Sequence, residues 1–282
     1  MRARPLMLVS LLTVGATIGC GGQLADDSRA AAGTGGAAGG SVPGGQGGSG
    51  DACPGTAGPA MVRLPQGYCI DSTEVTRGQY QAWFATNPPT SGQTARCTWK
   101  TNFVPDVDCM TSPNVYAGSG SENHPQVCVD WCDADAYCRA AGKRLCGKIG
   151  GGPGGFDDYA NASLSQWHNA CVSDGANNAF PYGSTYQPSY CNGYDNNPVT
   201  TAPVGSMHDC QSSVAGYAGV YDLSGNAWEW EDACGAPGQP DWCRLRGGSF
   251  GYRSPNLTCD ADNYDRVAYA SSSSVGLRCC SP

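Results

Sequence analysis

The sequence predicts a single irregular α+β domain that is rich in loops and disulfides. Its 282 residues include 41 Gly and 19 Pro, with 14% charged and 40% hydrophobic residues, which allows a core but few long regular elements. Helical periodicity is confined to three short segments, and the strand-like pieces are shorter still. The folded part holds an even number of cysteines behind an export signal, which indicates a disulfide framework.

The first helical segment covers residues 75–84, in which Tyr80, Trp83 and Phe84 share one face. Thr76 stands at the start of this pattern and is expected to cap the helix N-terminus. A later helical segment is SLSQWHNAC, residues 163–171.

Between them lies the helical segment VDWCDADAYCRAAG, residues 129–142. We expect Asp130 to cap it, Asp133 to lie in its first turn and Gly142 to end it. Its inward stripe is expected to consist of Trp131, Ala134, Tyr137 and Cys138. Short strand-like pieces at 219–221 and 275–278 lie among Gly, Asn, Asp and Ser turns.

Residues 1–19 are typical of a bacterial export signal, with Arg2 and Arg4 ahead of an apolar run. The apolar run is shorter than the roughly 20 residues that cross a bilayer. The segment Thr17-Ile18-Gly19-Cys20 resembles a lipobox, in which the cysteine after the cleavage site carries the lipids, although Thr17 stands where a large aliphatic residue is usual. We therefore expect lipidation at Cys20, and a soluble exported product is the alternative.

Residues 20–52 form a Gly-, Ala- and Ser-rich stretch with almost nothing to bury, which is typical of a flexible tether. The folded domain is expected to cover residues 53–282. A lipid on Cys20 would hold this domain at a membrane surface, as a cell-envelope lipoprotein in the periplasm or on the outer surface.

The cysteine pattern favours disulfides over metal sites. Removing Cys20 from the 17 cysteines leaves 16, and the domain contains no paired CxxC units of the kind that bind zinc. The three histidines are scattered without an HxxxH or HExxH motif. A formal charge of -8 with only three lysines excludes a basic surface for nucleic acid, so no nucleic-acid partner is expected.

Four sequence blocks occur in order along the domain. They are CIDSTEVTRGQY from Cys69, HPQVCVDWCDADAYCRAAGKRL from His124, GVYDLSGNAWEW from Gly219, and RGGSF followed later by VGLRC. Together these blocks resemble the formylglycine-generating enzyme (sulfatase-modifying factor) family. The resemblance covers residues 53–282 and implies a compact, loop-rich variant of the C-type lectin-like fold.

The resemblance also implies a structural calcium site in DLSGNAWEW. Asp222 and Glu229 match side-chain ligands of the family, while Gly225 and Ala227 match carbonyl ligands. A loop of this kind gathers the oxygen ligands that a hard cation prefers. The alternative is a turn held by Asx hydrogen bonds without a metal.

A second calcium loop is implied by CNGYDNNPVTTAPVG. Asn192 and the carbonyl of Gly193 match family ligands, and Asp195 or Asn197 could complete the shell. The segment is shorter than in many relatives, so an ordinary Asn-rich loop is the alternative.

The resemblance implies two disulfides, Cys138–Cys279 and Cys171–Cys259, each worth roughly 4 to 5 kcal/mol in chain entropy. Proximity in the sequence alone suggests four more: Cys53–Cys69, Cys97–Cys109, Cys191–Cys210 and Cys234–Cys243. This leaves Cys128, Cys132, Cys146 and Cys280 unassigned.

The stretch RGGSFGYRSPNLTC departs from the family at the residues that carry its chemistry. In formylglycine-generating enzymes, two cysteines shortly after GGS bind copper and oxidise a substrate cysteine. Here Tyr252 occupies the first of these positions, and residues 253–258 contain no cysteine. Because soft thiolates form the Cu(I) site, we expect neither copper nor a catalytic residue of the family mechanism.

Trp228 and Ser249 match pocket residues of the family, and Tyr252 and Arg253 are expected to lie on the same surface. Such side chains can bind a protein, peptide or glycan by stacking and hydrogen bonding. Simple packing in the core is the alternative for Trp228 and Ser249.

The favoured function is an exported, lipid-anchored, non-catalytic binding or scaffold module. The alternative is a divergent oxidoreductase that acts on a protein or peptide and uses other groups, or reactive thiols from Cys128 and Cys132 or from Cys279 and Cys280.

Overall fold

A computed structural model describes residues 52–55, 57–173, 175, 177–236 and 239–282. The described residues form one compact unit. The export signal, Cys20 and the tether up to residue 51 lie outside the described residues. Within the described part, no helix has both the length and the apolar character needed to cross a membrane.

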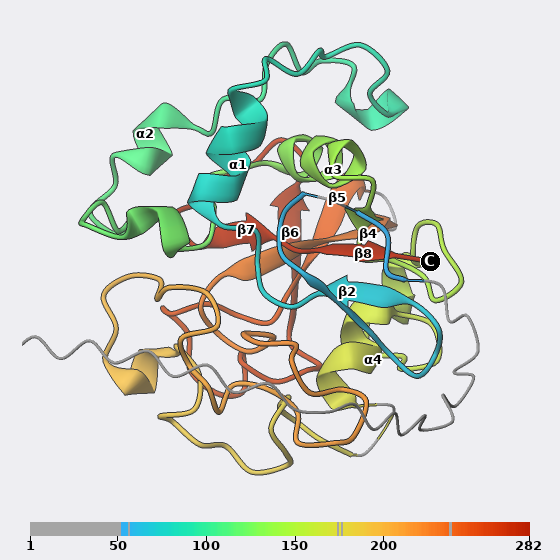
Figure 1. Cartoon of the computed structure of the whole chain (residues 1–282), viewed down its shortest axis with the longest axis vertical. Coiled ribbons are helices and arrows are strands. Elements are labelled where there is room, and N and C mark those ends of the chain that lie inside the picture. The colour runs from blue at the N-terminus through green and yellow to red at the C-terminus, as the bar shows by residue number, and fades with distance from the viewer. Residues whose placement is uncertain (1–51, 56, 174, 176, 237–238) are drawn as a thin grey trace, which may run out of the picture. The chain divides into compact units, whose positions relative to one another are not determined.

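Two sheets of four strands each form the centre of the described domain (Figure 1). The first sheet is antiparallel and has the order β1 (Met61–Arg63), β2 (Cys69–Asp71), β8 (Cys279–Ser281), β3 (Arg144–Leu145). The second has the order β6 (Asp262–Val267), β5 (Gln239–Arg246), β4 (Trp228–Ala236), β7 (Val275–Leu277). In the second sheet, β7 pairs with β4 in parallel and the other pairs are antiparallel.

The last two strands connect the sheets, because β7 belongs to one sheet and β8 to the other, with only Arg278 between them. Tertiary pairing therefore places Leu277 beside Trp230 and Cys280 beside Ile70.

The three helices that the sequence predicts are confirmed: α1 (Arg77–Phe84), α3 (Trp131–Ala140) and α4 (Gln166–Val172). Thr76 and Gln79 form a capping box for α1, and Asp130 and Asp133 form one for α3. Shorter helices are α2 (Val107–Met110), η1 (Ala95–Cys97), η2 (Ser121–Asn123), η3 (Phe156–Asp158) and η4 (Tyr194–Asn196).

Two apolar clusters hold these elements together, and in Figure 1 α1 and α3 lie on one side of the strands and α4 on the other. The first cluster packs Tyr80 and Tyr137 of the helices near Trp230, Leu245 and Leu277 of the second sheet. The second cluster surrounds Trp167 of α4 and includes Tyr68, Ile70 and Leu223. The predicted inward stripe of α3 is buried, as expected.

The predicted strand at 219–221 is wrong. Tyr221 makes only an isolated bridge to Gln211, because Gly219 and Asp222 on either side have positive φ angles of 90° and 61° that interrupt an extended chain. The strand predicted at 275–278 is confirmed as β7. Sequence periodicity missed the β4–β5 hairpin.

All sixteen cysteines of the described domain are paired in disulfides. The pairs include Cys138–Cys279 and Cys171–Cys259, as the resemblance implies, together with Cys53–Cys69, Cys191–Cys210 and Cys234–Cys243. The expected Cys97–Cys109 pair is wrong. Cys97 instead bonds to Cys132, and Cys109 bonds to Cys128.

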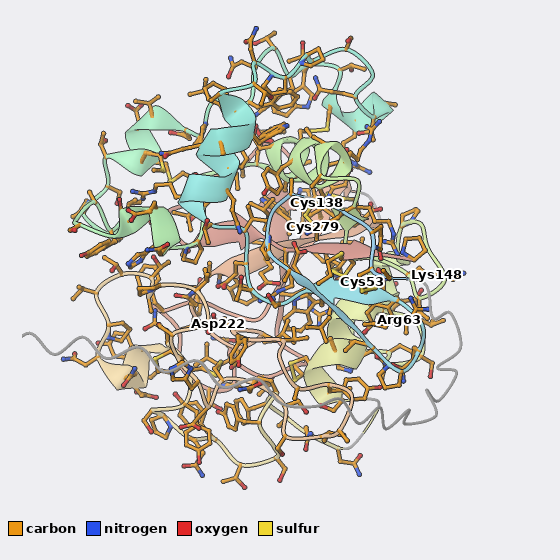
Figure 2. All side chains as sticks on the ribbon, viewed as in Figure 1. Cys53, Arg63, Cys138, Lys148, Asp222 and Cys279 are labelled. Carbon is orange, nitrogen blue, oxygen red and sulfur yellow. A yellow bond between two sulfur atoms is a disulfide. The ribbon has the colours of Figure 1, made fainter. Side chains whose placement is uncertain are left out.

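The vicinal cysteines at the chain's last strand bond to two different elements. Cys279 bonds to Cys138 of α3, and Figure 2 labels these two residues side by side. Cys280 bonds to Cys146, which follows β3. Neither Cys279 with Cys280 nor Cys128 with Cys132 is a free or mutually bonded pair, so these cysteines do not supply the reactive thiols that one form of the oxidoreductase alternative uses.

We expect the long-range Cys138–Cys279 disulfide to stabilise the domain more than the local Cys234–Cys243 disulfide. Their sequence separations are 141 and 9 residues. The chain-entropy relation then gives losses of about 5 and about 2.6 kcal/mol when both members of a pair are changed to Ala. Urea unfolding of the two double variants without reductant measures this difference, and equal losses would contradict it.

Candidate functional site

The loop that contains Asp222 turns sharply before it enters β4. Asp222, Gly225 and Asn226 all have positive φ angles. A Cβ on Gly225 would lie only 2.6 Å from the carbonyl oxygen of Asn192, so glycine is required there. The amide of Asn226 donates to that same carbonyl at 2.8 Å, and the amide of Gly225 donates to the carbonyl of Gly247 at 2.8 Å. These contacts bring three distant loops to one place.

Glu229 follows in β4 and is buried against Arg278. Its carboxylate oxygens accept from Arg278 Nε at 3.0 Å each, from Arg278 Nη2 at 2.8 Å and from Trp167 Nε1 at 2.8 Å. Both side chains of the ion pair are almost completely inaccessible. Glu229 therefore neutralises Arg278, and both of its carboxylate oxygens accept hydrogen bonds.

Asp222 and Glu74 lie in the same buried cluster. Asp222 Oδ2 accepts from the amide of Gly205 at 2.6 Å, and Glu74 Oε1 accepts from Asn226 Nδ2 at 2.8 Å. Glu74 Oε2 is buried and has no hydrogen-bond partner among the described residues. Burial, followed by the nearby Asp222 carboxylate, raises the pKa of Glu74 well above its usual value. Burial also raises the pKa of Asp222 to about 6.

The predicted calcium ligands do not fit a cation as they are arranged. Calcium coordination by Glu229 would require its carboxylate to leave Arg278. Asp195 is similarly engaged, because it accepts from Arg253 Nε at 2.8 Å and from the hydroxyl of Tyr186 at 3.2 Å. No group of three or more His, Cys, Asp or Glu side chains in the described ranges could hold a metal. Calcium at these loops thus remains a prediction that the side-chain contacts do not favour.

The predicted pocket residues do come together. The rings of Trp228 and Tyr252 meet edge to face at 5.4 Å, and the amide of Tyr252 donates to the carbonyl of Ser249 at 3.0 Å. Trp228 Nε1 and Ser249 Oγ are both buried and lack a hydrogen-bond partner among the described residues. Buried N–H and O–H groups are normally paired, so these two donors are unsatisfied, and a ligand could reach them only if the side chains that cover them move.

Arg253 lies at the surface beside this pair. Its guanidinium stacks over the ring of Tyr194 at 4.1 Å and forms the ion pair with Asp195. The amide of Tyr194 donates to the carbonyl of Tyr252 at 2.8 Å, which fixes the two loops together. We call the side chains of Tyr186, Tyr194, Tyr252 and Arg253 the tyrosine–arginine face.

The sequence analysis missed Tyr186 and Tyr194. A signal was present, since tyrosines recur at every fourth position from Tyr182 to Tyr194 in a Gly-, Pro- and Asn-rich stretch. Repeated aromatic residues in such a loop cannot all pack on the buried face of a helix. Tyr194 is indeed 50% exposed.

A family model described as "Sulfatase-modifying factor enzyme 1-like domain" matches residues 31–281. The chain belongs to this family. With the family established, the expected loop-rich, disulfide-bonded α+β fold of the C-type lectin-like type is confirmed.

Curated relatives match parts of the chain. The formylglycine-generating enzyme of Bos taurus is 34% identical over 47% of this chain and 30% of its own length. The inactive C-alpha-formylglycine-generating enzyme 2 of Mus musculus is 28% identical over 56% of this chain and 49% of its own length. The chain thus aligns with less than two thirds of either relative.

Solved structures include PvdO from Pseudomonas aeruginosa, with a TM-score of 0.49 and 22% identity over 76% of this chain and 79% of that one. CarF gives a TM-score of 0.48 with 20% identity over 82% of this chain and 96% of that one.

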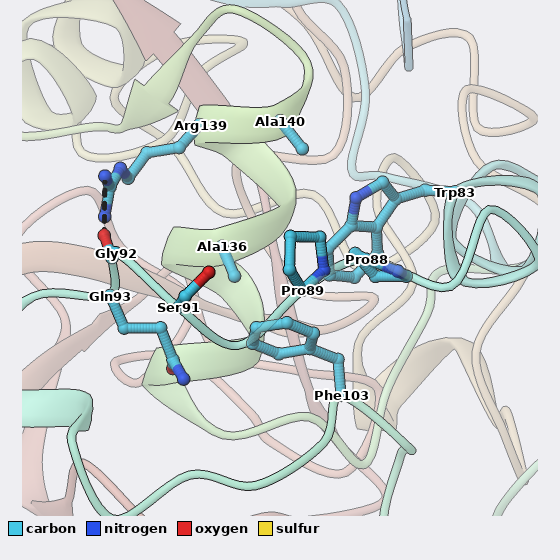
Figure 3. Close-up of a pocket in the computed structure, with 10 residues that line it drawn as sticks. All are labelled: Trp83, Pro88, Pro89, Ser91, Gly92, Gln93, Phe103, Ala136, Arg139 and Ala140. Atoms are coloured by element: carbon cyan, nitrogen blue, oxygen red, sulfur yellow. Dashed lines mark hydrogen bonds between the residues drawn. The ribbon is translucent and has the colours of Figure 1, made fainter.

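A separate apolar cleft lies between α1 and α3 (Figure 3). It has a volume of about 290 Å³, and the rings of Trp83, Pro89 and Phe103 line it. Arg139 Nη2 donates to the carbonyl of Gly92 at 3.1 Å and closes one end. The sequence analysis did not anticipate this cleft, which lies on other elements than the tyrosine–arginine face.

We expect Asp222→Asn to raise the melting temperature at pH 8 by about 2–6 °C. The pKa of Asp222 is raised to about 6, so its contribution to stability is present near pH 4 and is lost as the pH rises through 6. Asn has no such titration, can still accept from Gly205 and tolerates positive φ. Calorimetry from pH 4 to pH 8 should therefore show a flatter profile for the variant.

The same variant tests the calcium prediction. If the Asp222 carboxylate is a calcium ligand, Asp222→Asn should lower the melting temperature in saturating calcium, and a chelator should lower that of the wild type. A stabilised variant under both conditions would contradict calcium binding at Asp222.

Proposed function

We propose that this domain is a non-catalytic binding module and that its ligand contacts the tyrosine–arginine face above Trp228 and Ser249. The observation that carries the proposal is the pair of buried, unpaired donors, Trp228 Nε1 and Ser249 Oγ, next to Tyr252. Tyr252 stands where the family resemblance places the first copper-binding cysteine. A binding pocket without the redox centre explains both features.

The state of the cysteines supports a non-catalytic role. A cuprous site requires free thiolates, and every cysteine of the described domain is in a disulfide. A relative that is named as inactive matches more than half of this chain, which is in keeping with loss of activity on the same fold. A divergent oxidoreductase would need reactive groups other than these thiols.

A peptide segment of a partner protein is the ligand that we propose. Extended peptides present carbonyl oxygens to which Trp228 Nε1 and Ser249 Oγ could donate once the side chains that cover them move, while Tyr194 and Arg253 offer stacking surfaces at the rim. The same donors and rings could hold the hydroxyl groups of a glycan, so a glycan is the alternative ligand.

Export and lipid anchoring belong to the same proposal. Eight disulfides among the described residues support an oxidising compartment, where such bonds form and persist. We propose that lipids on Cys20 hold the domain at the cell envelope, on its periplasmic side or outer surface.

Lipid attachment is tested by metabolic labelling. We expect a labelled fatty acid to enter the wild-type protein and to be lost in Cys20→Ser, which should also move from the membrane to the soluble fraction. Equal labelling of both proteins would disprove attachment at Cys20.

Ligand binding is tested by selecting a displayed peptide library, and in parallel a glycan array, on the domain. We expect selected peptides to bind the wild type and to lose at least about fivefold in affinity with Tyr194→Ala or Arg253→Ala, since one stacking contact is worth about 1 kcal/mol or more. Phe84→Ala on α1 is the matched control, because Phe84 is 37% exposed and lies outside the face.

Two results would count against the proposal. The first is selection of peptides whose affinity does not change in either face variant. The second is conversion of a sulfatase-derived cysteine peptide to an aldehyde when copper(I) and oxygen are supplied, which would show that the domain is catalytic.

A further inference from the structure

Arg77 differs from the other buried cations of the described domain. Arg77 is only 8% exposed, and its Nε is buried without a hydrogen-bond partner. No carboxylate of the described residues forms an ion pair with it. The other buried cations each have a carboxylate partner: Lys143 with Asp71, Arg244 with Asp157, Arg246 with Glu231, and Arg278 with Glu229.

An unpaired buried guanidinium is unfavourable, because desolvation of a charge is normally offset by a counter-charge. Burial indeed lowers the pKa of Arg77. Only its Nε is fully sealed, so the ends of the guanidinium remain in reach of solvent. The missing partner can therefore be supplied from outside.

His124 contacts Arg77 through the backbone and brings an imidazole near it. The amide of Arg77 donates to the carbonyl of His124 at 2.9 Å, which holds the start of α1 against the end of η2. Burial, followed by the positive charge of Arg77, lowers the pKa of His124. An anion bound at the unpaired guanidinium would offset its charge and would also favour the protonated form of His124.

The imidazole of His124 is fixed in position by its neighbours. Its ring stacks on Tyr116 at 4.3 Å with an interplanar angle of 10°, and its Nδ1 is 3.0 Å from Thr201 Oγ1. No described residue bonds to Nε2 of the same ring, so this nitrogen can donate to a ligand when it carries the proton. Glu122 is the carboxylate closest to His124 in the sequence. It weakly raises the pKa of His124 and forms no ion pair with Arg77.

We propose that Arg77 and His124 form a binding site for one small oxyanion of the phosphate, sulfate or carboxylate class. The forked N–H groups of a guanidinium match two oxygens of such an anion, and His124 adds a third donor. This site is separate from the tyrosine–arginine face and does not depend on the function proposed for it.

The test is calorimetric titration of the domain with inorganic phosphate, sulfate and acetate at constant ionic strength set with chloride. We expect saturable binding of at least one anion at one site, at least tenfold weaker in Arg77→Met and weakened in Arg77→Lys, which keeps the charge without the fork. Arg139→Met is the matched control, since Arg139 lies on α3 with its side chain 48% exposed.

The ranking of the three anions identifies the chemical class that the site prefers. If Arg77→Met does not fold, His124→Gln and Arg77→Lys give the same comparison in folded protein. Absence of binding by all three anions, or affinities unchanged by substitution of Arg77 and of His124, would overturn the proposal.

Discussion

The ion pair between Glu229 and Arg278 is the interaction on which the rest of the domain depends. Arg278 is the residue between β7 and β8, and it donates to Glu229 of β4, to the carbonyl of Asp71 in β2 at 2.8 Å and to the carbonyl of Tyr221 at 2.7 Å. One buried side chain thereby joins both sheets and the loop before Asp222. Removing one member of such a pair leaves an uncompensated charge, which typically destabilises a protein by about 3–5 kcal/mol.

The charge of this centre explains the behaviour of its neighbours. Glu74, Asp222 and Glu229 surround a single guanidinium in surroundings without solvent. Burial raises the pKa values of Glu74 and Asp222, and the neighbouring carboxylates raise them further, since Arg278 can neutralise only one of the three. A calcium site of the family would use such a group of carboxylates as ligands. Here Arg278 and the raised pKa values reduce the repulsion between them instead.

The sequence could predict local features because their causes are local. Thr76 and Asp130 cap helices through neighbours three positions on, and both caps form as expected. The partner of Cys97 could not be read from spacing, since Cys109 is nearer in the chain but Cys132 is brought close by the packing of α3. The Glu229–Arg278 pair was hidden for the same reason, although both residues stand in blocks that resemble the family. Arg77 is unpaired because none of the described segments supplies a carboxylate partner to it, and a local sequence pattern cannot show this.

The position of β8 in the middle of the first sheet also constrains how the chain can reach its native state. β8 separates β2 from β3, and Cys279 and Cys280 within it bond to Cys138 and Cys146. The first sheet cannot close, and these two cysteines cannot find their partners, until nearly the whole domain has been synthesised. The first sheet and its two long-range disulfides can therefore form only late, after the rest of the domain is available to receive its last strand.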